Sequence, residues 1–319
     1  MALANLLRGT AFFAGFLPSF SRLGYEARRR RWPSARLNFQ GQRWLVTGAS
    51  AGIGRAIAVG AAQAGAEVVA VARQRDALER LAQDLPTGTL RPLTADLSLM
   101  QAVEQLARQS VARHGPFHVL VNNVGAMFNQ PATSEEGLDK GYATNLLGHY
   151  HLTRALLANG GLGTAATVIH MSSGGMYNVP LELERLDSHR RYDGTLAYAT
   201  HKRAQVALNG WWRRHYGDAI NSYVMHPGWV DTPGVASAMP EFRRAVGGLL
   251  RDPEAGADTA LWLAATRPAQ ASPEGIWFDR ALRSAHRLPG TRDGAHVEAL
   301  VRKLDQSLAA LQPPLQLTA

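Results

Sequence analysis

Short apolar runs alternate with segments of helical periodicity over most of the chain, from about residue 42 onward. The apolar runs predict strands at 43–47, 67–72, 90–94, 118–122, 166–171, 220–226 and, as a short last strand, 276–278. The segments between them predict helices at 54–64, 76–84, 99–113, 135–157, 198–216 and 255–265. Strands that alternate with helices of this length are typical of βαβ units, in which a parallel sheet is buried on both faces. The pattern therefore predicts an α/β fold, with a doubly wound parallel sheet in a single domain.

The two ends of the chain fall outside this alternation. We expect an amphipathic, basic N-terminal arm over residues 1–41, the main domain over 42–285, and a C-terminal tail over 286–319. Within the tail, the spacing over 293–311 predicts an amphipathic helix. The apolar face of that helix consists of Val297, Leu300, Val301, Leu304, Leu308 and Leu311.

The arm contains an apolar part followed by a basic part. Its apolar residues are Phe12, Phe13, Phe16, Leu17 and Phe20, and its basic ones are Arg22, the run Arg28 to Arg31, and Arg36. The apolar stretch 11–17 is too short to span a bilayer, and the cations follow it, whereas in a signal peptide they precede the apolar run. We therefore expect a cytoplasmic protein. Two roles stay open for the arm: a helix packed on the protein's own body, which we favour, or a segment in peripheral contact with a membrane surface.

Composition narrows the classes of function. The chain has 319 residues, 46% of them hydrophobic, which is enough for a folded core. The absence of cysteine excludes a disulfide scaffold, a thiol nucleophile and a cysteine-ligated metal site, and the histidines show no metal-ligand spacing, so no metal is expected. The net charge of +9 includes a strong local excess in residues 22–36, without the basic and aromatic interleaving of a nucleic-acid groove. No nucleic-acid partner is expected.

A glycine-rich turn follows the first predicted strand. It reads Thr-Gly-Ala-Ser-Ala-Gly-Ile-Gly over residues 47–54 and leads directly into a predicted helix. Glycines at 48, 52 and 54 let the backbone approach a pyrophosphate, and the helix offers it unpaired N–H groups and the positive end of its dipole. Because a strand precedes the turn and a helix follows it, the pattern predicts a dinucleotide-binding site.

The end of the second predicted strand indicates which dinucleotide binds. Folds that prefer NAD place an acidic residue there, on the ribose 2′-hydroxyl. In this chain the segment 71–75 reads Val-Ala-Arg-Gln-Arg, and the first acid is Asp76. Arg73, and less strongly Arg75, would pair with a 2′-phosphate that a carboxylate would repel. The sequence therefore favours NADP over NAD.

A tyrosine and a lysine four residues apart share one face of a predicted helix. Tyr198 and Lys202 lie on the helix that follows the fifth strand. A phenol donates a proton more readily when its pKa of about 10 is lowered, and a neighbouring ammonium favours the phenolate. We therefore expect Lys202 to lower the pKa of Tyr198 and Tyr198 to act in proton transfer.

Several motifs of the chain occur in the order found in one enzyme family. They are the glycine turn, Asp96-Leu97, Asn122-Asn123-Val124-Gly125, Asn145, Ser173, the Tyr198–Lys202 pair and Pro227-Gly228. On these motifs the chain resembles the short-chain dehydrogenase/reductase family over about residues 42–278. The resemblance implies a Rossmann-type fold and an NADP-dependent oxidoreductase that interconverts an alcohol and a carbonyl by hydride transfer. It leaves the substrate unknown, with only a weak indication of a lipophilic carbonyl.

The resemblance also implies roles for individual residues. Tyr198 would exchange the proton, Ser173 (and not its neighbour Ser172) would hold the substrate oxygen, and Lys202 would also bind the nicotinamide ribose. Asn145 would hold a water that links Lys202 to solvent. The other coenzyme contacts that the family implies are Gly48, Ser50, Gly52, Ile53, Gly54, Arg73, Asp96, Leu97, Asn123, Gly125, Pro227, Gly228 and Thr232. Family members are commonly dimers or tetramers, although monomers occur, so the resemblance leaves open whether this chain forms a homo-oligomer.

One departure from the family pattern concerns the substrate side. The loop between Ser173 and Tyr198 is longer than is common in the family, and we expect it to shape substrate choice. It contains Leu181, Leu183, Leu186, Arg190, Arg191 and Tyr192. The segment 234–250, with Met239 and Phe242 at helical spacing, falls at the position of the family's substrate lid, and core packing is the alternative for it.

Two other functions stay open. A non-catalytic NADP-binding regulatory protein of the same fold would bind coenzyme without turnover, but it would have no need to keep a proton-donating group. A sugar-nucleotide epimerase or dehydratase usually has a larger separate substrate region after the dinucleotide half, and this chain is short for one.

Overall fold

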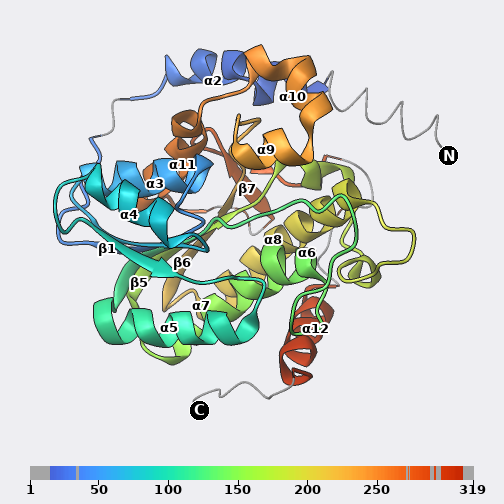
Figure 1. Ribbon diagram of the computed structural model, residues 1–319. Helices are drawn as coiled ribbons and strands as arrows, with labels where there is room; N and C mark the ends of the chain where they lie inside the picture. The colour runs from blue at the N-terminus through green and yellow to red at the C-terminus, as the bar shows by residue number, and fades with distance from the viewer. Residues whose placement is uncertain are drawn as a thin grey trace.

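A single sheet of eight strands forms the centre of the computed structural model, which describes residues 15–33, 36–270, 272, 274–287, 291 and 296–311 (Figure 1). The strands are β1 (Arg43–Thr47), β2 (Glu67–Ala72), β3 (Leu90–Thr94), β4 (Phe117–Asn122), β5 (Leu162–Met171), β6 (Ile220–Met225), β7 (Gly275–Phe278) and β8 (Ala281–Ser284). Their order across the sheet is β3-β2-β1-β4-β5-β6-β7-β8. The chain therefore runs outward from β1 to β3 and then returns to place β4 on the other side of β1. In such sheets, ligands bind in the crevice beyond the carboxyl ends of the strands where the order reverses, here β1 and β4.

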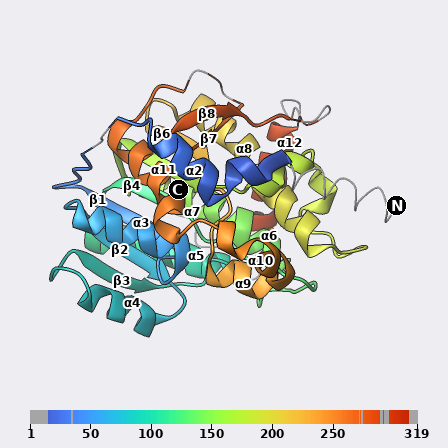
Figure 2. The same ribbon diagram turned by 90° about the horizontal axis from the view of Figure 1, so that it is seen from above.

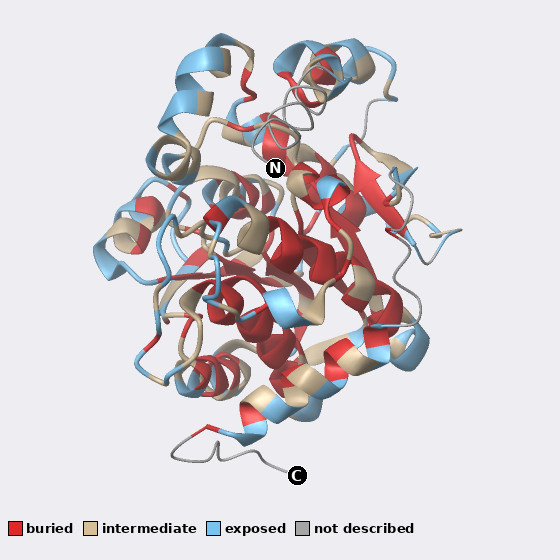
Figure 3. Cartoon of the chain, turned by 90° about the vertical axis from the view of Figure 1, so that its right-hand side faces the viewer, coloured by how far each residue is buried: buried red, intermediate tan, exposed pale blue. Residues whose placement is uncertain are grey.

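Helices cover both faces of the sheet, as Figures 1 and 2 show. On one face lie α3 (Gly52–Gln63), α4 (Arg75–Gln83) and α11 (Pro253–Thr266), whose Ile57, Leu78 and Leu263 are fully buried in one apolar cluster. On the other face lie α5 (Met100–His114), α7 (Gly148–Ala158) and α8 (Gly194–Tyr216), which form a second apolar cluster with α12 (Val297–Ala309). The buried residues in Figure 3 accordingly follow the sheet and the inner sides of these helices. The predicted doubly wound α/β fold is confirmed.

The last strand differs from the predicted all-parallel sheet. β1 to β7 pair in parallel, but β8 pairs antiparallel with β7, so the sheet is mixed. Asp279 and Arg280 join the two strands as a two-residue turn, with φ of 49° and 57°. Positive φ at both central residues is the backbone geometry of the tight hairpin turns that match strand twist. Without glycine or asparagine at these positions, this turn was not evident in the sequence.

The helix expected over 135–157 begins later and is interrupted. Asp139 caps its start by accepting a hydrogen bond from the Tyr142 N–H at 2.6 Å, and α6 spans Lys140–Tyr142. A π-helical turn, Ala143–Leu147, then leads into α7. The predicted start at residue 135 was therefore wrong by five residues, because residues 133 and 139 pair in an isolated antiparallel bridge instead of continuing the helix.

The described residues of both ends pack against the domain. In the N-terminal segment, residues 15–20 are helical and α2 spans Arg22–Arg29; Phe20 and Tyr25 are buried. At the other end, the apolar face predicted for the tail is buried on α12, where the Tyr142 hydroxyl and Ser307 Oγ are hydrogen-bonded at 3.0 Å. The division of the chain at residues 41 and 285 stays a prediction. Within the described residues, no helix combines the length and apolar character needed to cross a bilayer.

Candidate active site

A cavity of about 440 Å³ lies beyond the carboxyl ends of β1 and β4. Apart from Arg75, every residue predicted to contact the coenzyme lines it, although these residues come from six separate stretches of the chain. They are Gly48, Ser50, Gly52, Ile53, Gly54, Arg73, Asp96, Leu97, Asn123, Gly125, Tyr198, Lys202, Pro227, Gly228 and Thr232. Of the four predicted catalytic residues, Ser173, Tyr198 and Lys202 also line it. The fourth, Asn145, is buried behind the wall.

The glycine turn has the tight backbone that the sequence predicts. Gly48 and Gly52 have φ of 68° and 55°, a region that strains other residues. A Cβ on Gly54 would lie 2.2 Å from the Gly48 carbonyl oxygen, so only hydrogen fits where α3 begins. Among the described residues, no side chain caps the first turn of α3, and its N–H groups are left for a ligand. A turn of this shape in front of an uncapped helix fits the pyrophosphate of a dinucleotide.

The two candidate 2′-phosphate arginines differ in their surroundings. Arg73 lines the cavity after β2, with 68% of its side chain exposed and its Nη1 4.0 Å from Asp96 Oδ2. Arg75, two residues further, pairs instead with Glu79 at 2.6 Å on the surface and is not among the described lining residues. The structure thus brings only Arg73 to the site.

Thr47 and Asn123 join the ends of the two central strands. The Thr47 hydroxyl accepts a hydrogen bond from the Asn123 N–H at 2.9 Å and donates one to the Val121 carbonyl at 3.0 Å. The Asn123 side-chain amide donates to the Thr47 carbonyl at 2.9 Å. These bonds fix the floor of the cavity between the glycine turn and the loop after β4.

Ser173, Tyr198 and Lys202 meet at the far end of the cavity. A side-chain hydrogen bond joins Ser173 to Tyr198. Lys202 Nζ lies 5.5 Å from the centre of the Tyr198 ring and donates to the Met171 carbonyl at 2.7 Å. The neighbouring Ser172 hydroxyl donates to the Lys202 backbone carbonyl at 2.8 Å. The hydroxyl of Ser173, and not that of Ser172, is therefore the one paired with Tyr198.

The electrostatics of this pair differ from the sequence-based expectation. Burial raises the pKa of Tyr198 to about 12, and the hydrogen bond with Ser173 lowers it only in part. Burial also lowers the pKa of Lys202 to about 7. At neutral pH Lys202 therefore carries only part of a charge, which is too little to offset the burial of Tyr198. The expectation that Lys202 brings the Tyr198 pKa below its usual value is wrong for the protein without coenzyme.

Asn145 is held in the π-helical turn at the back of the site. Its side chain accepts a hydrogen bond from the Ala126 N–H and donates one to the Ala126 carbonyl, both at 2.8 Å. Its own backbone carbonyl accepts a bond from Gln205 at 2.7 Å. A Cβ on Gly125 would lie 3.2 Å from Lys202 Nζ and 3.6 Å from Asn145 Oδ1, so the small residue lets both groups approach the loop. The π turn, a feature common at functional sites, was not predicted.

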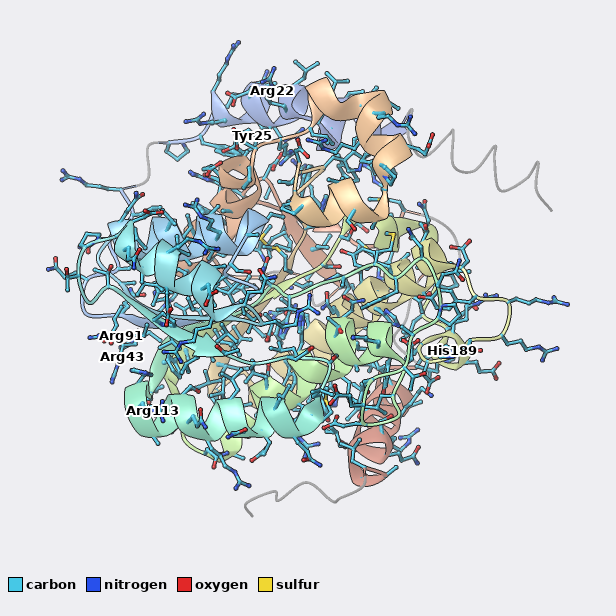
Figure 4. The ribbon with its side chains drawn as sticks, viewed as in Figure 1. Arg22, Tyr25, Arg43, Arg91, Arg113 and His189 are labelled. Carbon is cyan, nitrogen blue, oxygen red and sulfur yellow. The ribbon has the colours of Figure 1, made fainter. Side chains whose placement is uncertain are left out.

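Other predicted features lie outside the described cavity wall. His201 is buried, with Nε2 bonded to the Leu186 carbonyl at 2.7 Å. The long loop packs its Leu181 and Leu186 in the core, and Figure 4 shows His189 of this loop at the edge of the molecule. None of the loop residues named above is part of the described lining. The loop does contact the wall from its outer side, because the Tyr192 hydroxyl donates a hydrogen bond to the carbonyl of the lining residue Phe128 at 2.8 Å.

The outer part of the cavity is apolar. Met239 and Phe242, from the predicted lid segment, line it together with Met127, Phe128 and Trp229, which the sequence analysis did not single out. The lid segment forms α9 (Pro233–Ala238) and α10 (Pro240–Val246). The sequence could have indicated Met127 and Phe128 by their position shortly after β4, at the edge of the sheet where a ligand binds.

Comparison with known proteins supports this assignment of the fold. Dehydrogenase/reductase SDR family member 12 is 37% identical to the chain in Bos taurus over 311 residues and in Homo sapiens over 313. The bovine match covers 94% of this chain and 98% of that protein, and the human match 95% and 98%.

Two solved structures resemble the fold. One is a putative NAD(P) dependent gluconate 5-dehydrogenase from Beutenbergia cavernae with bound NADP, with a TM-score of 0.58 and 26% identity over 72% of this chain and 92% of that one. The other is a 3-ketoacyl-(acyl-carrier-protein) reductase from Brucella melitensis complexed with NADH, with a TM-score of 0.59 and 23% identity over 75% and 96%. The family described as short chain dehydrogenase matches residues 42–241. On this match and the near full-length similarity to the two mammalian relatives, the chain belongs to the short-chain dehydrogenase/reductase family of oxidoreductases.

Proposed function

We propose that this oxidoreductase uses NADP to interconvert an alcohol and a carbonyl, with Ser173, Tyr198, Lys202 and Asn145 as its catalytic set. The observation that carries the proposal is the hydrogen-bonded Ser173–Tyr198 pair beside the buried Lys202, at the far end of a cavity that starts at a glycine turn. A protein that only binds a dinucleotide needs the glycine turn but has no use for this polar group at the other end.

The roles follow from the contacts. When bound, the nicotinamide supplies or accepts the hydride. Tyr198, whose raised pKa of about 12 keeps it protonated at neutral pH, gives its hydroxyl proton to the substrate oxygen during reduction. Ser173 donates a hydrogen bond to the same oxygen and holds it against Tyr198. Lys202, with a pKa of about 7, exchanges protons near neutral pH and restores the proton that Tyr198 has given up.

Asn145 keeps this end of the site in place. Its two bonds to Ala126 tie the π turn to the loop after β4, and Gly125 of that loop lies next to Lys202. We propose that Asn145 also holds a water that connects Lys202 to solvent.

Coenzyme preference is assigned to Arg73. It is the cation at the end of β2 that lines the cavity, where an acid would repel a 2′-phosphate. Its distance of 4.0 Å from Asp96 leaves its guanidinium free to reorient toward a dianion, which attracts it more strongly than one carboxylate. We therefore propose NADP as the physiological coenzyme.

The substrate class is assigned from the cavity wall. Five large apolar side chains line its outer part, and they favour a lipophilic carbonyl or alcohol. They are Met127, Phe128, Trp229, Met239 and Phe242.

The proposal is tested with purified protein, NADPH or NADH, and a panel of aliphatic and aromatic aldehydes, ketones, quinones and ketone-bearing steroids. We expect oxidation of NADPH with at least one lipophilic carbonyl, and little with small polar ones. Coenzyme binding in calorimetry without turnover on any member of the panel would support the non-catalytic regulatory alternative instead.

A further inference from the structure

The N-terminal segment lies against two loops that line the active-site cavity. One loop carries Ser173 at the end of β5. The other, residues 227–232, follows β6 and contains Pro227, Gly228 and Thr232, which the family resemblance assigns to the coenzyme. Figures 1 and 2 show α2 crossing over this side of the domain, above β7. Residues more than 200 positions apart in the sequence are therefore in direct contact here.

The backbone of Phe20 holds the second loop. Its carbonyl oxygen accepts a hydrogen bond from the Trp229 N–H at 3.0 Å and another from Arg251 Nε at 2.8 Å. Arg251 also donates to the Pro227 carbonyl at 3.1 Å, and its backbone pairs with both Trp229 and Asp231. The loop that lines the cavity is thus bonded on its outer side to one arginine and one carbonyl of the N-terminal segment.

Arg251 is fixed by a buried charge cluster. Its side chain is fully buried and binds Asp279 with two bonds, of 2.6 and 3.0 Å. Arg28, from α2, donates to the same carboxylate at 2.7 Å. The Arg251 guanidinium also lies 5.1 Å from the centre of the Tyr25 ring and 5.0 Å from that of Phe278. Figure 4 shows Tyr25 on the side of α2 that faces the domain.

This cluster also explains the geometry of the β7–β8 turn. Asp279 has a φ of 49°, a conformation that costs a non-glycine residue on the order of 1 kcal/mol or more. The guanidinium groups of the buried Arg251 and the partly exposed Arg28 compensate for that cost and hold the carboxylate in place. Removing Arg251 would leave the buried Asp279 with only Arg28 as its partner, so Arg251 cannot be tested cleanly by deletion.

The ring of Phe20 fills the space behind the catalytic serine. A Cβ on Gly174, the residue after Ser173, would lie 2.5 Å from Phe20 Cε2, so the ring touches the backbone of this loop. On its other sides the ring centre is 4.7 Å from that of His226 and 5.2 Å from that of Phe278. Because burial holds the pKa of His226 well below its usual range, that imidazole is neutral and behaves as part of the aromatic cluster.

The second loop is equally crowded against the segment. Gly228 has a φ of 80°, and a Cβ there would lie 2.5 Å from Arg251 Cζ and 2.8 Å from the Phe20 carbonyl oxygen. Both loops therefore meet the segment with glycine backbone and no intervening side chain. Small movements of Phe20 are transmitted directly to Ser173 and to Pro227.

We propose that the N-terminal segment is an integral part of the active-site framework, and that Phe20 and Arg251 are positioning residues for Ser173 and the 227–232 loop. The proposal rests on the function proposed above. Catalysis depends on reacting groups being held to within a fraction of an ångström, and a displacement of about 1 Å can cost on the order of a hundredfold in rate. None of the described residues 15–33 lines the cavity, so in this proposal they act through placement alone.

The first experiment compares Phe20→Leu with a matched control, Phe39→Leu, in the full-length chain. Phe39 is also fully buried and packs on Trp44 with ring centres 4.6 Å apart, but it precedes β1, in the apolar cluster of α3, α4 and α11, and does not line the cavity. We expect both variants to lose similar thermal stability. At a temperature where both are folded, Phe20→Leu lowers kcat and raises the coenzyme KM, with kcat/KM reduced about tenfold or more, whereas Phe39→Leu stays close to wild type.

The outcomes separate this proposal from the proposed function. If wild type is active and the two variants lose equal activity per folded molecule, the positioning role is refuted. If wild type shows no turnover, the proposed function fails, and the dissociation constant for NADPH in the two variants decides the positioning role by itself. Equal dissociation constants would then refute it.

A second pair of variants probes the same contact from the side of the Ser173 loop. Gly174→Ala forces a methyl group toward the Phe20 ring, whereas Gly175→Ala meets its nearest atoms only at 3.8 Å. We expect Gly174→Ala to lose activity and Gly175→Ala to lose much less. A smaller side chain at position 20 should make room for the added methyl group, so the double variant Gly174→Ala/Phe20→Leu, or Gly174→Ala/Phe20→Val, should regain part of the lost activity. Wild-type activity in Gly174→Ala, or strictly additive losses in the double variant, would overturn the proposal.

Discussion

Arg73 and Arg75 are two positions apart, and only one of them reaches the cavity. Arg73 lines it, and Arg75 is paired with Glu79 on the surface. We therefore predict that Arg73→Asp weakens NADPH binding about tenfold or more, since a charge-assisted bond contributes about 1.5–3 kcal/mol and this side chain is largely solvated. NADH binding should change little. Calorimetric titration of both coenzymes measures this, and Arg75→Asp is the control with the same change in charge.

Equal losses of affinity for the two coenzymes, or in the two variants, would refute the 2′-phosphate role of Arg73. If Arg73→Asp weakens NADH as much as NADPH, the arginine contributes only a general attraction for anions. If Arg75→Asp matches Arg73→Asp, the effect comes from net charge and not from the position of one guanidinium.

Lys202 is a buried base whose pKa is lowered from 10.5 to about 7. Between these two pH values the unfolded chain therefore binds one more proton than the folded chain. The burial of Lys202 lowers the free energy of unfolding at pH 7, and this destabilisation disappears as the pH rises to 10.5. Relative to Lys202→Met, wild type should gain about 3 kcal/mol of unfolding free energy between pH 7 and 9.5. Urea unfolding of both proteins at the two pH values measures the difference. A constant gap between them would mean that Lys202 keeps an ordinary pKa.

The residues of the site were predictable where the constraint is local. Gly48, Gly52 and Gly54 are required by a turn within eight residues, and Tyr198 and Lys202 by one helical turn. Arg251 was not predictable, because its partners Phe20 and Asp279 are 231 and 28 positions away. No periodicity in the sequence reports contacts of that separation.

At the scale of elements, strand positions followed from the sequence more closely than helix ends did. Strand β2, rich in valine, begins and ends as predicted, because a fully buried strand is apolar along its whole length. The strand β8 was missed because two of its four residues are partly buried and two are exposed, so it carries no apolar pattern. The π turn was missed because it depends on bonds from Asn145 to Ala126, which belongs to another element.

The helix α2 has two faces with different properties. Tyr25 and Arg28 face the domain, while Arg22, Leu23 and Arg30 face solvent, and Leu23 is 62% exposed. An outward face with cations and an exposed leucine suits an anionic membrane surface, where each arginine contributes about 1 kcal/mol. We predict that the protein sediments with anionic vesicles at low salt and that Arg22→Glu/Arg30→Glu abolishes this.

The control for that prediction reverses two arginines on another side of the molecule. Arg91 and Arg113 lie at the lower left of Figure 4, far from Arg22 at the top, and Arg91→Glu/Arg113→Glu changes the net charge by the same amount. Equal loss of binding in both double variants, or no binding by wild type, would exclude a docking role for α2. Deleting the whole segment would be a poor test, because the active-site loops rest on it.

At the scale of the whole molecule, the doubly wound topology follows from alternating strands and helices, and the cavity follows from where that topology reverses. The placement of the N-terminal segment over the 227–232 loop does not follow from any of these rules. It depends on the ring of Phe20, which packs on Phe278 of β7, and on the charge cluster that joins Arg28 to Asp279 in the β7–β8 turn.

The most direct test of the account is the rate of NADPH-dependent carbonyl reduction by Tyr198→Phe, measured alongside its affinity for NADPH. Removing one hydroxyl leaves the cavity and the other predicted coenzyme contacts in place but takes away the proton donor. We predict that the rate falls by roughly a hundredfold or more, the range of general acid catalysis, while the dissociation constant for NADPH stays close to that of wild type. An unchanged rate in Tyr198→Phe would contradict the proposed mechanism.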